Sequence, residues 1–313
     1  MVIPPYVLEK HDVGSDVPHV VVCVCTYRRP ELLHTALSSI CRQETDGLFT
    51  YSVVVADNDI AESARSVVFA ISSHTPISIV YCVEQQQNIA RARNRAIAHA
   101  IGDLIAFLDD DEFVSDKWLL TLFRTMRTHR ADGVLGPVNP HFPNGAPRWV
   151  VEGGFYDRPV HPSGMRLHWS QCRTGNVLLK ADLFEEHASP FNPACLSGED
   201  QEFFRRKSEE GCSFIWCHEA SAHEMIPPSR WKRNFLVRRA LFRGIFAQRN
   251  HGLQPLRLLQ ALVSVPIYTV VLPLALALGQ AKFMSCVFKL SYHTGRLLGF
   301  LGMNPIRQAY VVE

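Results

Sequence analysis

The chain has 313 residues, 47% of them hydrophobic, so we expect one large or two smaller folded units with a substantial core. The net charge of +2 is unevenly spread: residues 1–224 contain 20 Lys and Arg against 29 Asp and Glu, whereas residues 225–313 contain 12 against 1. The nine scattered cysteines argue against a disulfide framework and favour a reducing cytosol. Residues 1–12 carry no basic stretch followed by an apolar one, so we expect no signal peptide.

Segments of strand and helix length alternate in the first part of the chain. The strands are expected at 19–25, 51–56, 77–83 and 104–108, and the helices at 31–41, 61–71, 89–101 and 118–128. Pro30 is placed to open the first helix, and Asn88 can cap the third. This alternation predicts an α/β fold with a doubly wound, mainly parallel sheet.

The fourth strand ends at four consecutive acids: Asp109, Asp110, Asp111 and Glu112. Ligands bind at the carboxyl edge of such sheets, and clustered carboxylates stay ionised only opposite a cation or several hydrogen-bond donors. We therefore predict a hard divalent cation here, with substrate phosphates as further ligands. The alternative is an acidic turn that only precedes a helix, with Ser115 as N-cap and Asp116 in the first turn.

Polar residues also follow the first two strands at the same edge. Thr26, Tyr27 and Arg28 follow the first strand, and Asp57 and Asn58 follow the second. The first turn contains no glycine, so the dinucleotide-binding fingerprint is missing and a Rossmann dehydrogenase is disfavoured. Three polar turns at one edge predict a binding site there.

A second acidic element opens a predicted helix near residue 200. Glu199 and Asp200 lie at its start, and Phe203 and Phe204 can anchor it in a core. The alternative is that these carboxylates only cap the helix. Further strands are expected at 133–138, 176–179 and 213–217, and the long segment 139–166, rich in Pro and Gly, is predicted to be a substrate lid.

The basic tail begins with a predicted amphipathic helix over 230–250. Its apolar face contains Trp231, Phe235, Phe242, Ile245 and Phe246. Arg238 falls on this face, whereas Arg239 lies off it. A buried arginine without a nearby acid in the sequence suggests a phosphate partner such as a donor diphosphate. The alternative is an arginine that snorkels at a membrane or domain boundary.

An uncharged stretch of 18 residues, 261–278, follows this helix. It is just long enough to span a bilayer, which needs roughly 20 residues, and Pro266 and Pro273 also permit a bent or re-entrant segment. Residues 283–301 predict an interfacial helix. A packed soluble hairpin of helices is the alternative. Positive residues before the apolar stretch place the catalytic body in the cytoplasm.

Six motifs, in this order, resemble the inverting family-2 glycosyltransferases with the GT-A fold. They are VVCVCTYRRPELL (21–33), VVVADND (53–59), NIARARNRAI (88–97), LIAFLDDDE (104–112), TGNVLL (174–179) and GEDQEFFRR (198–206). Each motif is weak alone, but the set is specific. Succinoglycan-type exopolysaccharide-assembly transferases are especially similar, because His223-Glu224 is followed by Ile226-Pro227 and a basic helix.

The resemblance implies a GT-A fold, with a Rossmann-like, mainly parallel mixed sheet covered by helices on both faces and a C-terminal helical, membrane-associated region. The domains would be a lead-in over 1–17, a catalytic domain over 18–228, and basic and hydrophobic helices over 229–313. Residues from three motifs would hold the donor nucleotide: Thr26, Tyr27, Arg28 and Asp57 at the base, and Arg93 and Asn94 at the ribose or diphosphate.

The acidic run would supply the metal ligand. Asp109 would face the ribose or sugar, and Asp111 would bind Mg²⁺ or Mn²⁺ as part of a DxD pattern. The pair Asp110 and Glu112 has equal spacing, and the first pair is preferred because it keeps the family's offset from Leu108.

The resemblance also assigns the remaining roles. His223 would complete the metal shell, in preference to His218, because only His223-Glu224 precedes the Ile-Pro pair. Asp200 would be the catalytic base. Candidate contacts of the diphosphate or acceptor are Glu199, Asn176, Trp169, Arg238 and Arg239.

The implied activity is metal-dependent, inverting transfer of a hexose such as glucose from a UDP-sugar to a lipid-linked glycan. The process would be exopolysaccharide or cell-surface polysaccharide synthesis at the cytoplasmic face of the inner membrane, with a membrane surface and no nucleic acid as partner. The alternatives are a phosphohydrolase or phosphotransferase with a DxD aspartate, and a non-catalytic nucleotide-sugar-binding component.

Overall fold

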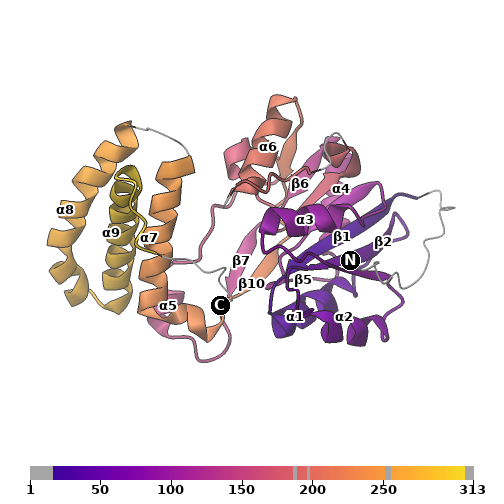
Figure 1. Ribbon diagram of the computed structural model, residues 1–313, viewed down its shortest axis with the longest axis horizontal. Coiled ribbons are helices and arrows are strands. Elements are labelled where there is room, and N and C mark those ends of the chain that lie inside the picture. Colours follow the sequence, from indigo (N-terminus) through magenta and orange to yellow (C-terminus); the bar gives the residue numbers. More distant parts are fainter. Residues whose placement is uncertain (1–16, 186–188, 196–197, 251–254, 307–313) are drawn as a thin grey trace. The chain divides into compact units, whose positions relative to one another are not determined.

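The computed structural model describes residues 17–185, 189–195, 198–250 and 255–306 (Figure 1). The chain divides into two compact units. Among the described residues, the first unit contains those up to Asn139 and those of Arg158–Met225, and the second contains Pro140–Asp157 and those from Ile226 to Ile306. The predicted division at 17/18 and 228/229 stays a prediction. All nine cysteines lie in the described residues and are free thiols.

A seven-stranded sheet forms the centre of the first unit, with the strand order β3-β2-β1-β4-β8-β6-β9. Its strands are β1 His19–Thr26, β2 Thr50–Asp57, β3 Ile79–Val83, β4 Leu104–Phe107, β6 Gly133–Leu135, β8 Val177–Lys180 and β9 Phe214–Trp216. Strands β3, β2, β1 and β4 are parallel neighbours, and β8 runs antiparallel between β4 and β6. The predicted mainly parallel, mixed sheet is confirmed.

Helices cover both faces of this sheet (Figure 1). On one face, α1 (Pro30–Ile40), α2 (Arg65–Ser72) and α4 (Trp118–His129) share a core with β1. On the other face, α3 (Ile89–Ile97) and α6 (Glu199–Glu209) contribute to a second core. Side chains of a strand alternate between its faces, so Val20, Val22 and Val24 enter the first core and Val21 and Cys23 the second.

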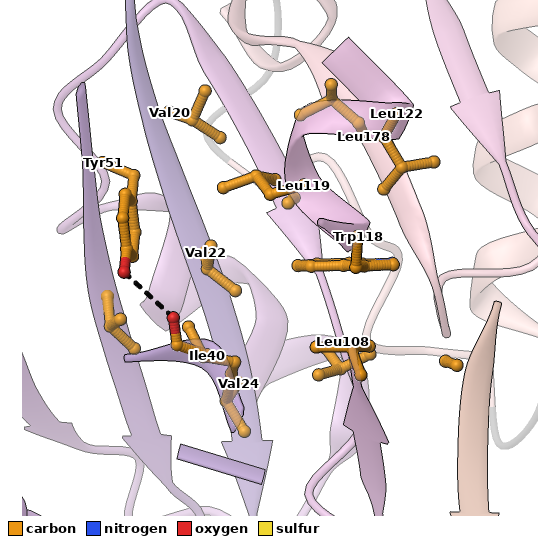
Figure 2. Packing of buried hydrophobic residues seen from close by; sticks show 14 of the residues in the cluster. Val20, Val22, Val24, Ile40, Tyr51, Leu108, Trp118, Leu119, Leu122 and Leu178 are labelled. Atoms are coloured by element: carbon orange, nitrogen blue, oxygen red, sulfur yellow. Dashed lines mark hydrogen bonds between the residues drawn. The ribbon is translucent and has the colours of Figure 1, made fainter. Parts of the chain in front are cut away.

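The first core is packed around aromatic and aliphatic side chains of α4. Figure 2 shows Trp118, Leu119 and Leu122 beside the valines of β1 and Leu178. The buried Tyr51 hydroxyl donates a hydrogen bond of 3.1 Å to the carbonyl oxygen of Ile40, which ties β2 to the end of α1 (Figure 2). A buried hydroxyl needs such a partner, because leaving it unpaired costs free energy.

The predicted helix starts are confirmed at Pro30 and Asn88. Pro30 opens α1, and Asn88 Oδ1 accepts a hydrogen bond of 3.1 Å from the Arg91 N–H at the start of α3. Ser115 does not cap α4, which begins at Trp118 after Lys117. The acidic run instead continues into a strand that the sequence analysis missed, β5 (Glu112–Val114), in a small sheet of order β5-β10-β7 with β10 Ala222–Met225 and β7 Val138–His141.

The second unit is helical. It contains α5 (Arg148–Val151), α7 (Arg233–Asn250), α8 (Pro255–Ala277) and α9 (Gln280–Phe300). Its core includes buried residues of the segment that was predicted to be a lid: Val150, Phe155 and Tyr156. The lid prediction is therefore wrong for Val150, Phe155 and Tyr156, because these side chains are buried in the core of this unit.

The orientation of α7 about its axis differs from the predicted one. Its most buried residues include Leu236 and Ala240, one helical turn apart, and Arg238 is exposed. Arg239 is half-buried instead, with its guanidinium carbon 4.5 Å from the centre of the Tyr156 ring. The prediction that Arg238 lies on the buried side is wrong, because small and aliphatic residues, rather than the aromatic ones, define the inner face.

Helix α8 is exposed and apolar. Among the described helices it is the one long and apolar enough to cross a membrane, with 23 residues and a mean hydropathy of 1.9. Only 11% of its apolar window is buried in the structure, and Pro266 and Pro273 lie inside the helix. A core helix of a soluble protein would be mostly buried.

Candidate active site

The Asp57 carboxylate stabilises the turn after β2 by accepting hydrogen bonds. The donors are the N–H groups of Asp59 (3.0 Å) and Ala64 (2.8 Å) and the Tyr81 hydroxyl (2.9 Å). Burial raises the pKa of Asp57, although these donors act in the opposite direction. The side chain has no exposed surface, so the structure does not present this carboxylate to a nucleobase as the sequence analysis expected.

Tyr27 and Arg28 form the accessible part of the turn after β1. Arg28 adopts a left-handed backbone conformation with φ 53°, and its Nε donates to Asp59 Oδ2 at 3.0 Å. Its guanidinium carbon lies 5.1 Å from the centre of the Tyr27 ring, and Gln87 donates to the Tyr27 hydroxyl. A half-buried ring flanked by a guanidinium offers a stacking surface for a planar base.

Asp110 and Asp111 both pair with the guanidinium of Arg29. Arg29 Nη1 lies 3.2 Å from Asp110 Oδ1 and 3.4 Å from Asp111 Oδ2, and the Thr26 hydroxyl donates to Asp110 Oδ2 at 2.8 Å. Burial and the neighbouring Asp111 carboxylate raise the pKa of Asp110 to about 6. Thr26 therefore contacts the acidic run in this structure.

Glu112 and Glu224 face each other across the antiparallel β5–β10 pair. Arg158 donates to Glu224 Oε2 at 2.6 Å, and its charge also acts on Glu112 and Asp109. Glu112 is 1% exposed, and its Oε1 is buried without a hydrogen-bond partner. Burial, together with the Asp109 carboxylate, raises the pKa of Glu112.

Arg93 connects the acidic run to α6. It forms a buried ion pair with Glu199 in the first turn of that helix. Burial lowers the pKa of Arg93, but the carboxylates of Glu199, Asp109 and Asp200 raise it above its usual value. The charges of Asp109, in the acidic run, and of the predicted base Asp200 therefore both act on the Arg93 guanidinium.

Two predicted ligand contacts have other partners in the structure. The Asn94 side chain donates to the Phe191 carbonyl at 2.7 Å and accepts from the Phe191 N–H at 2.9 Å, so it holds that segment in place. Asn176 is fully buried: it donates to the carbonyls of Pro137 and Ala220, both at 2.8 Å, and accepts from Trp118 Nε1 at 2.7 Å. In this structure the hydrogen-bonding groups of both amides bind the fold, and Asn176 has no exposed surface.

The predicted histidines, Trp169 and the two arginines of α7 lie in different parts of the structure. His223 is half-buried on β10 with its ring stacked on Phe113 at 5.3 Å, on the opposite face of the strand from Glu224. His218 lies in an exposed turn. Trp169 begins the short 3₁₀ helix Trp169–Gln171 and is half-buried against the second core. Arg238 and Arg239 belong to the second unit.

The donor set of the acidic run fits a hard divalent cation. Carboxylate oxygens are the preferred protein ligands of Mg²⁺ and Mn²⁺, and Glu112 Oε1 is buried without a hydrogen-bond partner. In the part of the chain that the structure describes, no three His, Cys, Asp or Glu side chains already converge as a metal-binding group.

Sequence reasoning missed two cations that lie next to the acids, Arg29 and Arg158. Arg29 directly follows the polar turn at 26–28, and this position next to a strand end was a usable signal. Arg158 gave no such signal, because its partner Glu224 lies 66 residues away. Glu112 and Glu224 were visible only as parts of motifs.

Comparisons with known proteins identify the family. The model of the family described as glycosyl transferase family 2 matches residues 21–185, more than half of the chain. The chain belongs to glycosyl transferase family 2 and is an enzyme, as the motifs predicted. The family favours a glycosyltransferase over a DxD phosphohydrolase or a non-catalytic binding component.

One relative is similar in sequence to this chain over most of its length, and another over less than half. The succinoglycan biosynthesis protein ExoM of Rhizobium meliloti is 34% identical over 304 residues, which cover 93% of this chain and 95% of that protein. Validoxylamine A glucosyltransferase of Streptomyces hygroscopicus subsp. jinggangensis is 35% identical over 134 residues, 41% of this chain and 32% of that protein.

Solved structures confirm the GT-A fold. The mannosyltransferase PcManGT of Pyrobaculum calidifontis, in complex with GDP-Man and Mn²⁺, superposes with a TM-score of 0.63 at 17% identity, covering 95% of this chain and 92% of that one. The S. aureus protein TarS 1-349 in complex with UDP gives 0.52 at 15% identity, over 92% and 93%. At these identities the likeness establishes the fold alone.

Proposed function

We propose that this family 2 enzyme transfers a hexose, such as glucose, from a UDP-sugar to a lipid-linked glycan with inversion, in exopolysaccharide or cell-surface polysaccharide synthesis. The observation that carries the proposal is the buried ion pair between Arg93 and Glu199 at the start of α6, where Asp200 is the next residue. The charge of Asp109, in the acidic run, also acts on Arg93. A donor-binding turn and a catalytic carboxylate must lie near each other for one sugar to reach both.

The donor side is the edge formed by β1, β2 and β4. The base would stack near Tyr27 and Arg28, above the turn that Asp57 braces, and Asp109 would face the ribose or sugar. Asp111, with His223 as a further ligand, would hold Mg²⁺ or Mn²⁺, which when bound neutralises the diphosphate as a Lewis acid. Complexes of the structural neighbours with UDP and with GDP-Man and Mn²⁺ support a nucleotide-sugar donor.

Asp200 would act on the acceptor. Its carboxylate takes the proton of the acceptor hydroxyl while that oxygen bonds to the anomeric carbon and the bond from this carbon to the diphosphate oxygen breaks. Direct displacement inverts the centre, so an α-linked donor gives a β-linked product. Asp200 Oδ1 accepts a hydrogen bond of 2.8 Å from the Gln201 N–H, which orients the carboxylate at the start of α6.

The acceptor proposal rests on the second unit. Helix α8 is exposed and apolar, and residues 226–306 contain no Asp or Glu. Such a surface suits an anionic membrane in which a lipid-linked glycan would reside, at the cytoplasmic face of the inner membrane. The name of the relative ExoM supports succinoglycan-like exopolysaccharide as the product class.

The experiment measures sugar transfer by the purified full chain to lipid-linked glycans in membranes, with UDP-glucose, UDP-galactose and GDP-mannose compared in the presence of Mn²⁺. The variant Asp200→Asn should lower turnover by roughly 10² to 10⁴ while donor affinity stays near normal, because only proton transfer is lost. The control Glu209→Gln makes the same change at the exposed far end of α6. Near-normal turnover of Asp200→Asn, or transfer from GDP-mannose alone, would contradict the proposal.

A further inference from the structure

The guanidinium of Arg29 occupies the turn where the divalent metal is proposed to bind. One nitrogen, Nη1, contacts both Asp110 (3.2 Å) and Asp111 (3.4 Å). The two carboxylate side chains are 7% and 9% exposed, whereas the Arg29 side chain is 22% exposed. The acids are thus fixed in the interior, and the cation reaches them from the side of the solvent.

A guanidinium and a divalent cation on one buried carboxylate repel each other strongly, because low dielectric surroundings screen their charges weakly. Metal binding at Asp111 is therefore coupled to departure of Arg29. Asp110 keeps a partner after that departure, since the Thr26 hydroxyl holds its other oxygen at 2.8 Å.

The position of Arg29 allows such a movement. Its backbone is fixed, because its carbonyl accepts the Leu33 N–H at 3.0 Å at the start of α1. Only the side chain would have to move, and arginine binds phosphate oxygens with two parallel hydrogen bonds. The other arginines of the site are bound elsewhere: Arg93 to Glu199 and Arg158 to Glu224.

We propose that Arg29 is an internal counter-ion of the acidic turn that the donor and its metal displace together. As the metal binds Asp111, Arg29 releases this carboxylate and binds the diphosphate of the donor. The inference rests on the proposed metal-dependent donor binding and adds a thermodynamic consequence. The metal and the nucleotide diphosphate therefore bind with strong positive coupling. The metal releases the guanidinium that the diphosphate binds, and the diphosphate holds that guanidinium away from the metal.

The test measures Mn²⁺ affinity by electron paramagnetic resonance of free Mn²⁺, with and without UDP. Arg29→Gln should bind Mn²⁺ alone about tenfold more tightly than the parent protein, and the factor by which UDP strengthens Mn²⁺ binding should fall by about tenfold or more. Arg29→Lys, which keeps the charge, should retain most of the coupling. Arg29→Met keeps the apolar stem and replaces the glutamine variant if that protein does not fold.

Arg42→Gln is the matched control, because it removes one exposed arginine that pairs with Asp116 and changes the net charge equally. Its Mn²⁺ affinity should not change. A folded Arg29→Gln protein that binds Mn²⁺ alone no more tightly than the parent overturns the inference while leaving the proposed function intact. A parent protein that binds no Mn²⁺ even with UDP overturns both.

Discussion

Arg93 and Glu199 form a buried ion pair between α3 and the first turn of α6, although 106 residues separate them along the chain. Their side chains are only 10% and 7% exposed. The Arg93 guanidinium carbon also lies 5.6 Å from the centre of the Phe191 ring. Because Asp200 follows Glu199 directly, this pair determines where the proposed base lies relative to the acidic run.

Removal of one partner of this pair should be costly. Arg93→Met leaves the Glu199 carboxylate buried without its cation, and we expect a loss of about 3 to 5 kcal/mol in the free energy of unfolding. The double variant Arg93→Met with Glu199→Gln should lose less than the sum of the single variants, because no uncompensated charge remains. Urea unfolding of all four proteins measures this difference. Additive losses would show that the two side chains do not interact.

Gly175 is expected to control the position of two carboxylates. A Cβ atom added there would lie 3.0 Å from both Asp109 Oδ2 and Glu112 Oε1. Gly175→Ala should therefore displace these oxygens, lower stability by about 1 to 3 kcal/mol and weaken donor binding in the presence of Mn²⁺. Titration with UDP-glucose measures the second effect. The control Val68→Ala removes volume from a buried position of α2 outside the site and should lower stability without changing donor affinity.

Asn176 should prove to be a structural residue. Its side chain satisfies the carbonyls of Pro137 and Ala220 and the N–H of Trp118, all buried. Asn176→Gly tolerates the left-handed φ of 55° but leaves these groups unpaired, so we expect a loss of about 2 kcal/mol or more in unfolding free energy. The KM values for donor and acceptor should stay near normal in the folded protein. A raised KM without lost stability would support the sugar contact that the sequence suggested.

The parallel half of the sheet could be predicted, because each of its strands is a continuous apolar run that ends in a polar turn. Strand β8 shows the limit of this reasoning: Val177 pairs antiparallel with Phe107, and nothing in either segment specifies a partner 70 residues away. The short strand β5 was hidden because its first residue, Glu112, is a buried acid. Buried charges oppose the hydrophobic pattern on which strand prediction depends.

The site could be predicted in its acids but only in part in its cations, because the sequence indicated Arg28 and Arg93 but neither Arg29 nor Arg158. Asp109 to Glu112 form one conspicuous run, whereas Arg29, Arg93 and Arg158 come from three distant segments and meet the acids only in the fold. In α7 the aromatic residues suggested one face, but close packing selected another: a Cβ on Gly244 would lie 2.1 Å from the Tyr292 carbonyl oxygen of α9. Helix packing of this kind depends on a partner surface that periodicity alone does not contain.

The exposed apolar face of α8 should hold the enzyme at a membrane. Val270 and Leu274 are 78% and 61% exposed and one helical turn apart, so Val270→Glu with Leu274→Glu should leave the fold intact. These charges oppose burial in lipid, and we expect the double variant to move from the membrane pellet to the supernatant. Flotation with vesicles that contain anionic lipids measures the same change on purified protein.

The matched control places two glutamates at Ile60 and Ile101 of the first unit, which are 68% and 76% exposed. Both double variants replace two exposed aliphatic side chains by glutamate. A general effect of added negative charge would therefore release both of them from the membrane. We expect only the α8 variant to lose binding, because isolated apolar side chains on a protein surface do not form a membrane-binding face. Equal retention of both variants in the pellet, or a parent protein that remains in the supernatant at low salt, would remove the membrane from the proposed function and leave a soluble acceptor.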